Sequence, residues 1–235
     1  MLAWATVLLV SCARSLPKAN PPQAAPTIGS MLIPAQLAVR TDTFIVRNQN
    51  DSVGTVLVVY VGGPDSIIDS IQALGQQAVV VFDLRSGTAT TVTDSIREEI
   101  VHLRYSQNEM RGLRVAINKT GRRDSVNLFH QLPPGTLDRR SLALVLQLIP
   151  LKDGATWSFP MFDSWSQKVV SVWVAVEGPT WRRIKAGTIA VYRLDVRGHM
   201  FILPRVFYVT ADSPRRILRM EQGTVSWELM NRRLQ

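Results

Sequence analysis

The stretch that decides the fold is Val170-Ser-Val-Trp-Val-Ala-Val-Glu177, in which valine occupies every second position. Successive side chains of a β-strand point to opposite faces, so the four valines fall on one face. The other face carries Ser171, Trp173, Ala175 and Glu177. One apolar and one mixed face are typical of a strand in an antiparallel sheet that packs a single side on a core.

Strand patterns continue on both sides of this stretch. In 190–197, Arg193 and Asp195 share one face and Tyr192, Leu194 and Val196 share the other. Three further runs close the chain as an antiparallel meander, with turns predicted at 212–215 and 222–223. The strands expected after 190–197 are 206–210, 216–221 and 224–229. The strands expected before 170–177 are 43–47, 54–61, 79–84, 112–118 and 125–130.

One helix interrupts the strands. Residues 136–148 are predicted to form a mostly buried helix, with Thr136 as its N-cap and Pro150 ending it. The segment 66–74 fits either a weak helix or a strand. The residues therefore predict one mostly antiparallel β domain with a single well-marked helix.

The N-terminus resembles a bacterial lipoprotein signal. Residues 1–11 are a short apolar run, too brief to span a membrane, although they lack the usual Lys or Arg. Leu9-Val-Ser-Cys12 resembles the lipobox, which implies that Cys12 is the mature N-terminus and carries lipid. Residues 12–30 are predicted to be a flexible tether, and 31–235 the folded domain. Ala13 then favours the outer membrane, facing the periplasm, in a diderm cell. The alternative is an incidental or buried cysteine.

Charge and composition exclude several classes. Lys and Arg number 27 against 18 Asp and Glu, a formal charge of +9, and the one cysteine excludes an internal disulfide or a multi-cysteine metal site. The arginines come largely as doublets, which meet anionic lipid headgroups or, in the interpretation we favour, decorate turns and edge strands. We expect no nucleic-acid partner. The doublets are 122–123, 139–140, 182–183, 215–216 and 232–233.

No motif points to catalysis. His102, His130 and His199 lack a ligand-type spacing, and Glu98 and Glu99 would point to opposite faces of a strand. A nucleophile elbow, a phosphate loop and a dinucleotide fingerprint are absent from the sequence. We therefore expect that the protein is not an enzyme and that it binds no metal and no cofactor.

The C-terminal half resembles a known family. Its motifs are Leu151-Lys-Asp-Gly-Ala-Thr-Trp157, Phe207-Tyr-Val-Thr-Ala-Asp-Ser-Pro-Arg-Arg-Ile-Leu-Arg-Met-Glu221 and Gly223-Thr-Val-Ser-Trp-Glu-Leu229. They are similar to an uncharacterised family of bacterial envelope proteins with the β-clam architecture of the periplasmic lipoprotein carrier and its outer-membrane receptor. The resemblance implies a single curved antiparallel sheet, an open half-barrel, with the short helix on its concave side. It also implies an apolar concavity for acyl chains or a partner segment.

Four tryptophans are candidates for lining that concavity, with ordinary core packing as the alternative. We expect a non-enzymatic, membrane-anchored envelope lipoprotein that binds a lipid or a hydrophobic segment there. A structural or protein-docking lipoprotein with a filled core and an envelope protein partner is the alternative. An envelope hydrolase whose catalytic groups converge without motifs is the third hypothesis. The tryptophans are Trp157, Trp165, Trp173 and Trp227.

Overall fold

The computed structural model describes residues 28–49, 51–63, 65–73, 75–118, 120–184, 187–198 and 204–230. They form one curved, unclosed sheet of fifteen strands, and only the short β9 pairs parallel to its neighbour. The strands are β1 (Arg40–Asn48), β2 (Asp51–Gly62), β3 (Ser66–Ala73), β4 (Gln76–Asp83), β5 (Thr88–Ile96), β6 (Glu99–Ser106), β7 (Glu109–Ile117), β8 (Arg123–Gln131), β9 (Leu137–Asp138), β10 (Thr156–Asp163), β11 (Lys168–Ile184), β12 (Gly187–Gly198), β13 (Arg205–Thr210), β14 (Ile217–Gln222) and β15 (Val225–Leu229).

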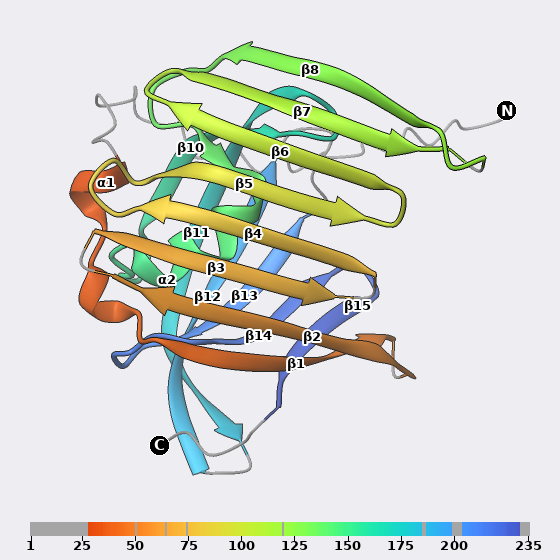
Figure 1. The fold of residues 1–235 in the computed structure, drawn as a ribbon. Helices are drawn as coiled ribbons and strands as arrows, with labels where there is room; N and C mark the ends of the chain where they lie inside the picture. Colours follow the sequence, from red (N-terminus) through yellow and green to blue (C-terminus); the bar gives the residue numbers. More distant parts are fainter. Residues whose placement is uncertain are drawn as a thin grey trace, which may run out of the picture.

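The sheet consists of two runs of sequential strands joined at one seam. β1 to β8 form the first run and β9 to β15 the second, and β1 pairs with β15 between them, from Phe44 opposite Leu229 to Asn48 opposite Val225. In Figure 1 the first run lies in front of the second, so the sheet folds over itself. The predicted single, curved, antiparallel sheet is confirmed.

The concave side of the sheet holds the helix. A 3-10 turn, η2 (Arg139–Ser141), leads into α2 (Leu142–Leu148), which lies between the two runs (Figure 1). Six of the seven α2 side chains are buried, including Leu144, Leu146 and Leu148 at 0% exposure. Two short helical segments, α1 (Ile28–Met31) and η1 (Pro34–Gln36), precede β1. The expected position of the helix is confirmed.

The alternation of valines across 170–177 has the predicted effect. The four alternating valines of β11, at positions 170, 172, 174 and 176, are buried, whereas Trp173 between them is 47% exposed on the outer face. The ambiguous segment 66–74 contains the strand β3, because Ile67 and Asp69 alternate inward and the backbone pairs with both β2 and β4.

The N-cap prediction at Thr136 is wrong. The helical segment begins later, and its cap is Asp138, whose carboxylate accepts a 2.8 Å hydrogen bond from the backbone N–H of Arg140. The hydroxyl of Thr136 instead donates to the carbonyl of Pro133 at 2.6 Å. Asp138, two residues further along the chain, therefore takes the capping role predicted for Thr136.

One hairpin extends beyond the sheet. β10 accompanies β11 only as far as Ala175, and β13 accompanies β12 only to Val191. Thr180–Ile184 and Gly187–Val191 pair with each other after a register shift between Glu177 and Thr180, and of these residues only Ala190 and Val191 also bond to the backbone of β13 or the residue after it. We call these residues the β11–β12 ribbon, and Figure 1 shows it projecting at the bottom of the molecule.

Candidate functional site

A buried ionic cluster fixes the start of the helical segment. Asp138 is fully buried, and besides the backbone of Arg140 it accepts a 2.5 Å hydrogen bond from the hydroxyl of Tyr105 on β6. The guanidinium of Arg140 also lies 3.4 Å from the Asp138 carboxylate and donates to Ser164 at 3.0 Å. Burial and the Asp138 charge raise the pKa of Tyr105, so this phenol remains a donor.

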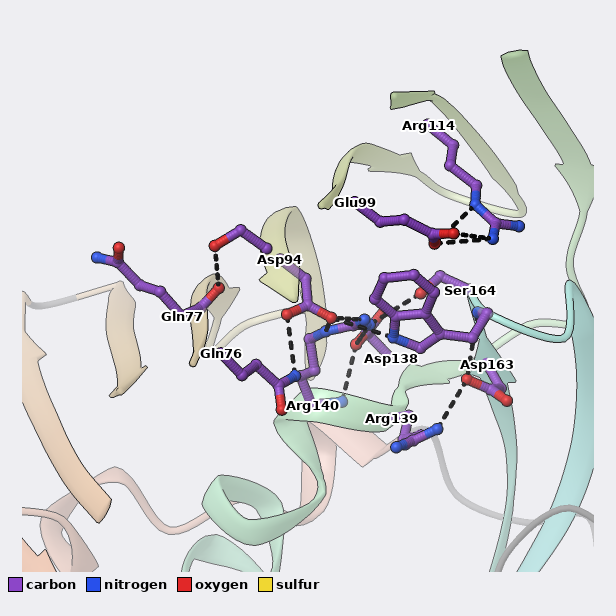
Figure 2. A network of polar contacts seen from close by, with 12 residues as sticks. Gln76, Gln77, Asp94, Glu99, Arg114, Asp138, Arg139, Arg140, Asp163 and Ser164 are labelled. Atoms are coloured by element: carbon purple, nitrogen blue, oxygen red, sulfur yellow. Dashed lines mark hydrogen bonds and ion pairs between the residues drawn. The ribbon is translucent and has the colours of Figure 1, made fainter. Parts of the chain in front are cut away.

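Arg140 also reaches across to the other run of strands. Its Nε donates to Asp94 on β5 at 2.7 Å, and its Nη2 contacts the same oxygen. Figure 2 shows Asp94 between Arg140 and Gln76, whose amide donates to the second carboxylate oxygen at 3.0 Å. The indole of Trp165 adds a third donor at 3.2 Å. The cluster therefore ties β5 to the helical segment and to the loop after β10.

The charges of this cluster are satisfied inside the protein. Burial lowers the pKa of Arg140, but the carboxylates of Asp138 and Asp94 outweigh it and the net pKa is raised. Asp94 and Asp138 have no exposed surface and Arg140 has 9%. Because each ionised group is sequestered and hydrogen-bonded, the arrangement is suited to holding the fold together rather than to reacting with a substrate.

A second set of polar contacts holds the end of α2. Arg40 on β1 pairs with Asp42 at 2.7 Å and donates to the side chain of Gln147 at 2.5 Å. The Gln147 amide in turn donates to the hydroxyl of Tyr60 at 3.1 Å. Arg215 donates to the carbonyl of Ile149, the residue that ends the helix, at 2.5 Å. An arginine at a helix C-terminus also complements the negative end of the helix dipole.

Asp69 is the buried acid that lacks such partners. It lies on the inner face of β3, opposite Tyr60 on β2, with no exposed surface. Among the described residues, neither of its carboxylate oxygens has a hydrogen-bond partner. Burial raises the pKa of Asp69 to about 7, against the opposing effect of the Arg40 charge. In the folded protein, the carboxylate of Asp69 therefore becomes protonated near neutral pH.

The arginine doublets are not uniformly surface decoration, and for two of them that interpretation is wrong. Arg140 is buried in the first cluster, and Arg215 is 6% exposed against the helix end. Arg216 reaches Asp42 at 2.9 Å. Doublet 232–233 lies outside the described residues, whereas 122–123 and 182–183 are exposed.

The four candidate tryptophans occupy different surroundings. Trp165 stacks near the guanidinium groups of Arg114 and Arg140, at 5.6 and 5.9 Å. Trp227 packs near Phe44, with ring centroids 6.4 Å apart, and Trp157 packs against the core from β10. Trp173 points to the outer face and so does not contribute to the concave side. A ligand cavity lined by the other tryptophans stays a prediction.

An open groove lies on the outer face of the sheet, at the seam between the two runs. The β11–β12 ribbon forms one wall and β1, β13, β14 and β15 form the other, enclosing about 580 Å³. The ring of Tyr208 lies 3.9 Å beneath the guanidinium of Arg182. We call this the arginine groove, and its lining residues are Ile45, Arg47, Arg182, Arg183, Ile184, Tyr208, Leu218, Arg219, Glu228, Leu229 and Met230.

Positive charge exceeds negative charge in the arginine groove. Glu228 lies 3.6 Å from Arg47 and 3.8 Å from Arg219, and Glu221 lies 2.7 Å from Arg219. Two carboxylates therefore oppose four lining arginines; the guanidinium of Arg182 lies over Tyr208, whereas Arg183 follows it on the opposite face of the strand. Aliphatic side chains such as Ile184 and Leu229 lie between the charges, so the groove offers both cationic and apolar contacts.

Other predicted features are not brought together. His102 and His130 lie on β6 and β8, His199 lies outside the described residues, and in the described part of the chain no three His, Cys, Asp or Glu side chains gather as a metal site would require. Glu99 pairs with Arg114 at 2.8 Å near the surface. No helix within the described ranges is both long and apolar enough to cross a bilayer. Cys12 lies outside the described residues, so its lipidation stays a prediction.

Comparisons with models of protein families, with curated proteins and with solved structures gave no match.

Proposed function

We propose that this chain is a non-enzymatic, lipid-anchored protein of the bacterial envelope that binds an anionic amphiphile in the arginine groove. The observation that supports this most strongly is the combination, in one groove of about 580 Å³, of four arginines with aliphatic side chains. Volumes of this order are common for small-molecule sites. An amphiphile with a phosphate or carboxylate head matches both kinds of lining residue.

The concave side is a less suitable place for a ligand. It is occupied by α2, whose leucines are fully buried among the strands of both runs. A ligand there would have to displace the chain's own helix and break the contacts of Arg140 and Gln147. The outer groove needs no such rearrangement, and for this reason the proposal places the ligand outside the sheet.

The proposed anchor is Cys12. The predicted tether of 12–30 is shortened by the structure, because α1 begins at Ile28 and Ile28 is buried in the core. A tether of residues 12–27 would hold the domain near the membrane while leaving it free to rotate. Replacing Cys12 with Ser should move the protein from the membrane fraction to the soluble fraction after cell lysis and a high-salt wash, which weakens purely electrostatic membrane contacts. Unchanged membrane association of that variant would contradict the anchor without bearing on the arginine groove.

The groove is tested by titrating the protein with a lysophospholipid below its micelle concentration. We expect the phosphatidylglycerol form to bind, and the double substitution Arg182→Glu with Arg183→Glu to weaken binding by at least about tenfold, since each arginine near an anionic lipid contributes about 1 kcal/mol. The matched control reverses the exposed doublet at Arg122 and Arg123, far along the sheet at the start of β8. An equal loss of binding in both variants would mean that net charge alone explains the effect.

A structural or protein-docking role is the second candidate. Its support is the filled concave side together with the exposed edge strand β8, on which Val126 and Phe129 are exposed. If no anionic amphiphile binds the groove at all, this second function becomes the preferred one.

A further inference from the structure

The β11–β12 ribbon has a feature that groove binding alone does not use. Trp181 is 75% exposed, the highest value among the large apolar side chains in the described ranges. It lies opposite Ala190, whereas Arg182 lies opposite Ile189, so the two side chains point to opposite faces of the ribbon. Arg182 covers Tyr208 in the groove, and Trp181 therefore points away from the groove.

We infer that the β11–β12 ribbon is a membrane-contacting element, with Trp181 at the headgroup level of an anionic bilayer and the arginine groove beside a lipid headgroup. This inference rests on the proposed function, because it names the bilayer as the source of the anionic amphiphile. It commits to a lipid surface rather than to a free phosphate or a protein partner.

Three observations support a bilayer as the partner. The ribbon extends beyond the strands that flank it and projects from that end of the sheet, where it can meet a flat surface (Figure 1). Tryptophan is the side chain most suited to the boundary between headgroups and acyl chains, because its ring is apolar and its N–H is polar. The neighbouring Arg182 and Arg183 supply the positive charge that an anionic leaflet attracts.

The same strand provides an internal comparison. Trp173 is also on β11 and is 47% exposed, but it lies in the body of the sheet, between β10 and β12. Exposure of an indole is therefore not peculiar to the ribbon. What distinguishes Trp181 is its position on a projecting element beside two arginines, and a membrane role must depend on that position.

The experiment uses the full chain carrying Cys12→Ser, so that lipidation cannot hold the protein on a membrane. Sedimentation with vesicles of phosphatidylglycerol and phosphatidylcholine should show binding that Trp181→Ala weakens by about tenfold, a loss in line with removing one buried interfacial side chain. Trp173→Ala is the control and should bind as the parent does. Vesicles of phosphatidylcholine alone should bind far less, and added salt should weaken the anionic binding.

The two proposals fail in different ways. If soluble lysophosphatidylglycerol binds but Trp181→Ala sediments with anionic vesicles as the parent does, the membrane inference is overturned and the groove function stands. If Trp173→Ala loses as much vesicle binding as Trp181→Ala, the inference is also overturned. If the vesicles bind through Trp181 while the soluble lipid does not bind, the groove function fails. Inorganic phosphate competing with vesicles at millimolar concentration would point to a free anion and contradict the bilayer as the partner.

Discussion

Asp94 and Asp69 are fully buried aspartates on the inner face of the same run of strands, yet their surroundings differ completely. Asp94 accepts hydrogen bonds from Arg140, Trp165 and Gln76, whereas Asp69 accepts none from the described residues. The difference teaches that the cost of burying a carboxylate is set by side chains brought from elsewhere in the chain, and not by the strand that carries it.

Breaking the paired site should have the largest effect. Arg140→Ala would leave Asp94 and Asp138 buried without their cation, and we expect the free energy of unfolding to fall by about 3–5 kcal/mol. Urea unfolding followed by tryptophan fluorescence measures it. The neighbouring Arg139, which contacts Asp163 at 3.1 Å and whose side chain is 35% exposed, is the control. Arg139→Ala should cost less than about 1 kcal/mol, and similar losses at both positions would contradict the comparison.

Removing the charge of Asp69, which has no hydrogen-bond partner among the described residues, should instead raise the free energy of unfolding. The pKa of Asp69 is raised from 3.8 to about 7, so between these values the folded state holds a proton that the unfolded state has released. This group therefore makes the free energy of unfolding fall as pH rises from about 4 to about 7, and the loss persists above pH 7. Asp69→Asn should raise that free energy by about 1–3 kcal/mol at pH 8 and change it little at pH 4.

The measurement for Asp69 is a set of urea unfolding curves at several pH values. Asp94→Asn is the matched control, because it places the same amide at a site where Arg140 requires the negative charge, and it should destabilise the protein at pH 8. A destabilising Asp69→Asn at pH 8 would show that this carboxylate has a partner in solution.

The smallest effect should come from the exposed pair drawn beside the cluster in Figure 2. Glu99 and Arg114 form an ion pair at 2.8 Å, but about a third of each side chain is exposed. Glu99→Gln should change the free energy of unfolding by no more than about 0.5 kcal/mol, because solvent screens such pairs. The same unfolding curves test it, and a loss near that of Arg140→Ala would mean that burial does not separate the two kinds of pair.

Much of the fold follows from local pattern, as β11 shows. Alternation placed four of its valines inward, and the leucine-rich run predicted α2 in the right place. Period-two spacing also carried an unused signal for the buried acids: Asp69 is two residues from Ile67, and Asp94 is two residues from Val92, so both fall on an apolar face. Such spacing indicates that an acidic side chain is buried, but it does not indicate which side chains contact it.

The rest depends on contacts between distant parts of the chain. Arg140 and Asp94 are 46 residues apart, and no local rule distinguishes Arg140 from the exposed Arg182. The arginine groove likewise requires the ribbon to lie beside strands of the seam, which come from both ends of the chain. The ribbon begins after the register shift between Glu177 and Thr180. Doublets in a sequence therefore look alike until tertiary structure separates them.

The seam between β1 and β15 has a consequence for how the chain folds. Every other pair of neighbours in the sheet is also consecutive along the chain, so those pairs can form early in folding. β1 is different: one of its sides pairs with its neighbour β2, but the other pairs with β15, about 180 residues later. Until β15 pairs, Phe44-Ile-Val46 is an apolar strand with an unprotected edge, which is a site for aggregation. Among the described strands, β15 thus protects β1.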